Sequence, residues 1–121
     1  NVSFVGRLDG NDKFLFLAQD GLFIYPTYRD SFGLVVIESM AVGTPVLAYE
    51  EGSIPEILGN NSFDCVVNKG DWRAIASKAV WLFSKPAMMN QLSRQAITLV
   101  EDKYSLNSFR RNLIIELSEN Y

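Results

Sequence analysis

The stretch Asp30-Ser31-Phe32-Gly33-Leu34-Val35-Val36-Ile37-Glu38 decides the fold, because two carboxylates enclose a turn and an apolar run. Before it, the apolar residues 22–25, closed by Pro26, predict a buried strand, and after it residues 41–48 predict a helix end, a turn and another strand. Asp30 therefore falls in a strand-to-helix loop and Glu38 on the helix. In an open parallel sheet, ligands bind at the carboxyl ends of the strands, against helix N-termini.

Glu38 is the unusual residue of this helix, since nearly every other position from 34 to 42 is apolar. A carboxylate in such a setting needs hydrogen-bond donors or a counter-charge, because desolvating it alone is costly. The two hydroxyls of a ribose would serve, and so would a backbone amide or a nearby arginine. A structural glutamate tied to a neighbouring loop is the alternative, and spacing alone slightly favours it.

The remaining pattern predicts an α/β protein with a Rossmann-like parallel sheet, right-handed crossovers and helices on both faces. No linker or repeat interrupts it, so we expect one domain over residues 1–121. Strands are predicted at 1–5, 22–25, 46–49 and 65–68. Helices are predicted at 12–20, at 31–42, as one turn at 54–58, and after Asp71, Pro86 and Ser105. Apolar stripes are Trp72, Ile75, Ala76, Ala79, Val80 and Phe83, then Met89, Leu92, Ala96 and Leu99, then Leu106, Phe109, Leu113 and Leu117.

Composition excludes several classes of protein. A net charge of −3 and a pI of about 4.8, without a basic stripe, argue against a nucleic-acid partner. The single cysteine, Cys65, cannot form an internal disulfide and is predicted to be a buried apolar residue, which suits a reducing compartment. With no signal peptide and no apolar run of about twenty residues, we expect a cytoplasmic location.

The segment from Pro26 to Glu56 resembles the signature of the GT-B glycosyltransferases, specifically retaining family 4. That family carries Pro-Ser-x-x-Glu-x-Phe-Gly-Leu-x-x-x-Glu-Ala-Met-Ala-x-Gly-x-Pro-Val and then Gly-Gly-x-x-Glu. This chain carries Pro-Thr-Tyr-Arg-Asp-Ser-Phe-Gly-Leu at 26–34, Glu-Ser-Met-Ala-Val-Gly-Thr-Pro-Val at 38–46 and Gly-Ser-Ile-Pro-Glu at 52–56. Asp30 replaces the first glutamate and Ser53 the second glycine, which leaves the donor sugar open.

The resemblance implies that the chain is a fragment, the C-terminal part of the donor-binding half of a GT-B fold. Such a fragment would bind a nucleotide diphospho-sugar for a retaining transferase whose acceptor is a glycan or a lipid-linked sugar. The acceptor-binding N-terminal domain, and the basic pair that neutralises the donor pyrophosphate, would belong to the rest of the parent chain. A membrane surface would be contacted only through that parent.

Residue roles follow from the same resemblance. Glu38 would accept hydrogen bonds from the ribose, and Asp30 would face the donor sugar near its reacting carbon. Gly33 would leave space for the donor. No Asp-x-Asp motif and no histidine is present, so neither a metal site nor a cofactor is expected. The backbone amides of Phe32, Gly33 and Leu34 would hold sugar hydroxyls and phosphate, and Leu8 and Lys13 would border the base.

Other interpretations stay open at this point. The structural alternatives are a helix cap for Asp30, a turn glycine for Gly33 and a solvated surface lysine for Lys13. A nucleotide-sugar epimerase of the same fold is one functional alternative, although the absence of histidine counts against it. A nucleotide-sugar-binding module without activity is another, and a plain α/β interaction domain with a structural Glu38 is a third.

Overall fold

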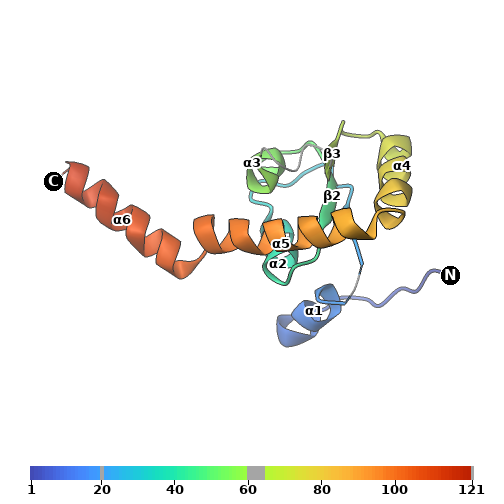
Figure 1. Ribbon diagram of the computed structural model, residues 1–121, viewed down its shortest axis with the longest axis horizontal. Helices are drawn as coiled ribbons and strands as arrows, with labels where there is room; N and C mark the ends of the chain where they lie inside the picture. The colour runs from blue at the N-terminus through green and yellow to red at the C-terminus, as the bar shows by residue number, and fades with distance from the viewer. Residues whose placement is uncertain (20, 60–64, 121) are drawn as a thin grey trace.

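The computed structural model describes residues 1–19, 21–59 and 65–120, and within them a parallel sheet carries helices on both faces (Figure 1). The strands β1 (Phe23–Tyr25), β2 (Val46–Tyr49) and β3 (Val66–Val67) lie in that order, with β2 in the centre. Phe23 lies opposite Val46, and Ala48 lies opposite Val66. The loops that follow the three strands therefore meet at one edge of the sheet, as the sequence predicted.

The helices agree closely with the predicted element order. Strand β2 and helix α3 have the predicted bounds, whereas α2 begins three residues later than predicted because Ser31–Gly33 form a turn. The first helix begins at Gly10, two residues earlier than predicted, and ends at Leu17 rather than at Asp20, which itself lies outside the described residues. The helices are α1 (Gly10–Leu17), α2 (Leu34–Ala41), α3 (Ile54–Leu58), α4 (Trp72–Phe83), α5 (Pro86–Lys103) and α6 (Leu106–Asn120).

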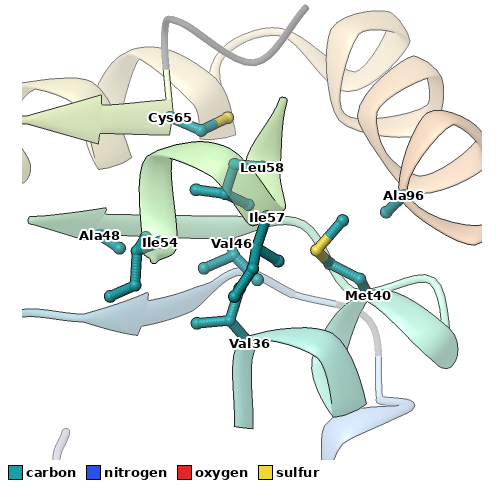
Figure 2. Close-up of a cluster of buried hydrophobic side chains, with 9 residues drawn as sticks. All are labelled: Val36, Met40, Val46, Ala48, Ile54, Ile57, Leu58, Cys65 and Ala96. Carbon is teal, nitrogen blue, oxygen red and sulfur yellow. The ribbon is translucent and has the colours of Figure 1, made fainter. Parts of the chain in front are cut away.

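The core divides along the central strand, because successive side chains of a strand point to opposite faces. Val46 and Ala48 face α2, α3 and α5, where Cys65 is buried as predicted (Figure 2). Leu47 and Tyr49 face the other way, toward α4. Helices thus cover both sides of β2, and all four of its residues are buried. The first cluster consists of Val36, Met40, Val46, Ala48, Ile54, Ile57, Leu58, Cys65 and Ala96.

The strand predicted at residues 1–5 is absent. Residues 1–9 have no regular secondary structure, and Val2 and Phe4 are 83% and 97% exposed. The apolar alternation is present in the sequence, but a strand persists only where a neighbouring strand accepts its backbone hydrogen bonds. Strand β1 pairs with β2, and no strand of the described ranges pairs with residues 1–5.

Helix α4 buries only part of its predicted stripe. Ile75 and Ala79 face the sheet as predicted, together with the fully buried Leu82, which the prediction left out. Trp72 and Val80 point to solvent, because the apolar surface of the helix is wider than its contact with the sheet. In α5 the predicted face packs toward the core: Ala96 is buried, and Met89, Leu92 and Leu99 are half-buried.

Helix α6 lies at the end of α5, away from the sheet (Figure 1). Its predicted stripe residues Leu106, Leu113 and Leu117 are exposed, and the side chain of Phe109 lies outside the described residues. No helix in the described ranges is both long and apolar enough to cross a bilayer.

Candidate functional site

Asp30 is fixed in the loop between β1 and α2 by three hydrogen bonds. Its Oδ2 accepts a hydrogen bond from the Tyr25 hydroxyl at 2.6 Å. Its Oδ1 accepts from the backbone amides of Phe32, at 3.0 Å, and Gly33. The side chain therefore closes the turn before α2 and is held at the carboxyl end of β1. The N-cap of α2 is Gly33, so Asp30 is not the helix cap of the structural alternative.

These bonds stabilise the ionised form of the carboxylate. The Tyr25 hydroxyl, and then the Gly33 and Phe32 amides, lower the pKa of Asp30 below its ordinary value, although partial burial opposes them. Burial, and then the bond to Asp30, raise the pKa of Tyr25. An ionised carboxylate has about four acceptor positions and donates nothing. With three bonds already accepted, Asp30 has room to orient one further hydroxyl and no proton to transfer at neutral pH.

Gly33 has a local structural reason for being glycine. It caps α2 with φ 64°, in the left-handed region, and a Cβ there would lie 2.6 Å from the Cδ1 of Ile57. Its own amide and that of Phe32 are used by Asp30, whereas the structure records no acceptor for the Leu34 amide among the described residues. Of the three predicted donor amides, Leu34 is the one that remains to bind a ligand. The side chains of Phe32 and Leu34 are exposed around it.

The loop after β2 is fastened to the Asp30 loop. A Cβ on Gly52 would lie 2.0 Å from the carbonyl oxygen of Asp30, so only glycine allows the two backbones to approach this closely. The Ser53 hydroxyl donates to the carbonyl of Ser31 at 2.9 Å. The serine that replaces the family's second glycine is therefore used to join the two loops.

Glu38 has a lysine as its counter-charge. Its Oε2 lies 2.7 Å from Nζ of Lys13, and the two side chains are 25% and 33% exposed. This oxygen is shielded from solvent and receives no directed hydrogen bond in the described part of the chain, so the ion pair compensates its charge. A second contact joins α1 to the same region, since the Thr44 hydroxyl donates to the carbonyl of Leu17.

The predicted site residues thus form two groups. In the first group, Asp30 accepts hydrogen bonds from the amides of Phe32 and Gly33. In the second, Lys13 forms an ion pair with Glu38; the sequence predicted that Glu38 needs a partner but did not identify Lys13. Leu8 is half-buried just before α1. No hydrogen bond or ion pair between the two groups is recorded over the described ranges.

Sequence reasoning missed a polar cluster at the same edge of the sheet. Lys69, after β3, has its Nζ 2.6 Å from Oε2 of Glu51, after β2, and 5.9 Å from the ring centroid of Tyr28. Tyr28, after β1, packs edge-on against Tyr49 with ring centroids 5.7 Å apart. Each of the three loops contributes one residue, so their positions after consecutive parallel strands were the signal that could have revealed the cluster.

The fold is an α/β domain built on a parallel sheet, and the chain belongs to the family described as glycosyl transferases group 1, which it matches over residues 1–99. It is 30% identical over 95 residues to the capsular polysaccharide biosynthesis glycosyltransferase CapM of Staphylococcus aureus, covering 78% of this chain and 25% of that protein. It is 27% identical over 103 residues to N-acetyl-alpha-D-glucosaminyl L-malate synthase of Bacillus anthracis, covering 85% and 26%. The chain thus spans about a quarter of these relatives' length.

Proposed function

We propose that the chain is the donor-binding portion of a retaining GT-B glycosyltransferase of family 4, and that it holds a nucleotide diphospho-sugar. The parent protein would be cytoplasmic and would transfer the sugar to a glycan or lipid-linked acceptor held by an N-terminal domain. The observation that carries the proposal is the position of Asp30, an ionised carboxylate fixed at the carboxyl end of β1 and beside the start of α2. In parallel α/β sheets this is where ligands bind.

Asp30 would act on the sugar as a fixed acceptor. Breaking the bond between sugar and phosphate develops positive charge on the sugar ring, which a nearby carboxylate stabilises without attacking it. The remaining acceptor position on Oδ2 would orient one sugar hydroxyl. The Tyr25 hydroxyl and the two amides occupy its other acceptor positions, so the orientation of the carboxylate is fixed.

The leaving diphosphate would meet the N-terminal end of α2. The Leu34 amide and the helix dipole supply partial positive charge there, in a geometry fixed before the reaction. Amide dipoles alone are weak for a doubly charged group, so the basic pair of the parent protein would complete this site.

Glu38 would accept the ribose hydroxyls. A carboxylate has about four acceptor positions, so the ion pair with Lys13 leaves Glu38 able to bind them. The same ion pair favours the competing interpretation, a binding or interaction domain in which Glu38 only fastens α1 to α2. The two interpretations differ in whether a change at Glu38 alters ligand affinity or stability.

The activity test uses the chain alone and its parent protein. Because catalysis needs both substrates held together, the chain alone is expected to release no nucleoside diphosphate from UDP-, GDP- or ADP-sugars above the buffer blank. The parent is expected to release one of them, and Asp30→Ala should abolish this while Asp102→Ala, on the exposed surface of α5, should not. Release by the chain alone, or an active parent carrying Asp30→Ala, would contradict the proposal.

A further inference from the structure

The ring of Tyr28, in the loop after β1, is exposed to solvent but held in place. Its side chain is 58% exposed, and the ring packs edge-on against the buried Tyr49, with ring centroids 5.7 Å apart. Gly70, at φ 86°, passes close to the Tyr28 hydroxyl, since a Cβ on this glycine would lie 3.3 Å from it. The position of the ring is therefore restricted before any ligand binds, which lowers the entropic cost of binding.

Lys69 and Glu51 place hydrogen-bonding groups beside this ring. Nζ of Lys69 lies 2.6 Å from Oε2 of Glu51 and 5.9 Å from the ring centroid of Tyr28. The side chains of Lys69 and Glu51 are 43% and 20% exposed. An ammonium group has three donors and a carboxylate has about four acceptor positions. The ion pair therefore leaves donors and acceptors that can bind a ligand together, while the two charges compensate each other.

This polar cluster of Tyr28, Glu51 and Lys69 lies next to Asp30. Tyr28 precedes Asp30 by two residues in the loop after β1. Glu51 precedes Gly52, where a Cβ would lie 2.0 Å from the carbonyl oxygen of Asp30. Because the strand order is β1-β2-β3 and Lys69 follows β3, the cluster extends from Asp30 across the carboxyl edge of the sheet.

An exposed aromatic ring beside both donors and acceptors matches the chemistry of a pyranose. A sugar ring has an apolar face of C–H groups, which can stack on an aromatic ring, and hydroxyls at its edge that both donate and accept hydrogen bonds. An anionic ligand is less suited, because Glu51 already neutralises Lys69. A purely apolar ligand is less suited as well, because it would desolvate the ion pair without replacing its bonds to water.

We propose that the polar cluster binds a pyranose, with Tyr28 stacking on the sugar ring and Lys69 and Glu51 binding its hydroxyls. The inference rests on the proposed function, because it makes the cluster an extension of the sugar site at Asp30. The pyranose belongs to the donor or to the acceptor, and these two sources share the same chemistry. Tyr28, Glu51 and Lys69 would then determine which sugar the parent protein accepts.

The first arm of the test concerns the donor. The parent protein is titrated calorimetrically with UDP-glucose, GDP-mannose and ADP-glucose, and separately with UDP, GDP and ADP. If the cluster binds the donor sugar, Tyr28→Ala should weaken the affinity for the preferred nucleotide sugar about five- to tenfold, because the stacking is lost. The affinity for the matching nucleotide, which carries no sugar beyond its ribose, should stay unchanged.

The second arm concerns the acceptor. The parent protein, saturated with its preferred nucleoside diphosphate, is mixed with the methyl pyranosides of glucose, galactose and mannose, and binding is followed by saturation-transfer NMR. If the cluster binds the acceptor sugar, the wild type should show transfer to one of these pyranosides, and Tyr28→Ala should lose it while nucleotide-sugar affinity is kept.

Further variants separate binding from folding. Tyr28→Phe keeps the ring and should bind the sugar like the wild type, whereas Lys69→Met should weaken binding about three- to tenfold through lost hydrogen bonds. The matched control is Tyr104→Ala, which removes an exposed tyrosine at the end of α5 and should have no effect on sugar binding. Thermal melts confirm that each variant is folded, and Tyr28→Leu replaces Tyr28→Ala if that variant is not.

Two results would overturn the proposal. The first is wild-type binding in both arms by the folded Tyr28→Ala and Lys69→Met proteins, which would leave the ion pair as a link between loops. The second is an equal loss of affinity for nucleotide and nucleotide sugar in Tyr28→Ala. Either result leaves the proposed function standing if Glu38→Gln still weakens nucleotide binding, whereas a parent protein that binds no nucleotide sugar would reject both.

Discussion

The Nζ of Lys13 lies 2.7 Å from Oε2 of Glu38, so an ion pair joins α1 to the middle of α2. Helix α1 buries none of its residues, and its other recorded bond to this region is from the Thr44 hydroxyl to the carbonyl of Leu17. The position of α1 therefore depends largely on these polar contacts. Any ligand that binds Glu38 must share the carboxylate with Lys13 or displace it.

A double-mutant cycle should measure this coupling. Lys13→Gln and Glu38→Gln should each destabilise the fold, and the double variant should be more stable than their sum predicts by about 0.5–1 kcal/mol. Chemical denaturation of the four proteins, at low salt and again at high salt, gives the value. Additive effects at low salt would show that the ion pair contributes nothing to the position of α1.

The bond from Tyr25 to Asp30 predicts a pH-dependent loss of stability. The folded pKa of Asp30 lies below the ordinary value of 3.8, so its stabilising contribution is present above that pH and is lost as the pH falls through the lowered folded value. Tyr25→Phe removes the first of its donors and should cost about 1 kcal/mol near neutral pH. The deficit should shrink below pH 3.8.

The matched control is Tyr28→Phe, since Tyr28 is a tyrosine of the same loop region that does not donate to Asp30. Carboxyl-carbon NMR titration of Asp30 should show an upward pKa shift in Tyr25→Phe and none in the control. If Asp30 titrates in Tyr25→Phe as it does in the wild type, the Tyr25 hydroxyl does not lower the pKa of Asp30.

Gly33 and Gly21 form a natural comparison of two glycines that flank β1. Gly33→Ala forces a side chain into a left-handed conformation, 2.6 Å from Ile57, and should cost more than about 1 kcal/mol. Gly21→Ala meets nothing within 4 Å and should be nearly neutral. Thermal melts of the two variants test this, and equal melting temperatures would contradict the observed turn at Gly33.

The exposed apolar residues of α6 predict self-association. Leu113 and Ile114 are 46% and 65% exposed and lie four and three residues before Leu117, which is 49% exposed, so the three side chains form an apolar patch on one side of the helix. Light scattering should show a mass that rises with concentration, and Ile114→Asp should reduce it. Asn112→Asp adds the same charge at an exposed polar position and should have little effect. A monomer at all concentrations would show that the patch does not associate.

Local patterns predicted the elements that lie at the centre of the sheet. Strand β2 and helix α3 were predicted with their observed bounds, because a fully apolar run and a proline at the first helical turn leave few alternatives. The start of α2 was predicted too early, because the Asp30 carboxylate binds the Phe32 and Gly33 amides and holds Ser31–Gly33 in a turn.

What the sequence could not supply is the pairing between segments. Residues 1–5 have the pattern of a strand, but a strand also needs a neighbour, which no local pattern specifies. The need of Glu38 for a counter-charge was predictable, whereas the choice of Lys13 depends on how α1 lies against α2. For the same reason the predicted apolar stripe of α4 included Val80, which is exposed, and left out Leu82, which is buried.

The most direct test of the proposed function is Glu38→Gln in the parent protein, by calorimetric titration with UDP, GDP and ADP and by a thermal melt. If Glu38 binds ribose, the affinity for the preferred nucleotide should fall about ten- to a hundredfold, since charge-assisted bonds to two hydroxyls are weakened. Glu101→Gln, on the exposed surface of α5, should bind like the wild type. A Glu38→Gln protein that melts much earlier but binds equally well would contradict the ribose assignment and leave Glu38 as the anchor of α1.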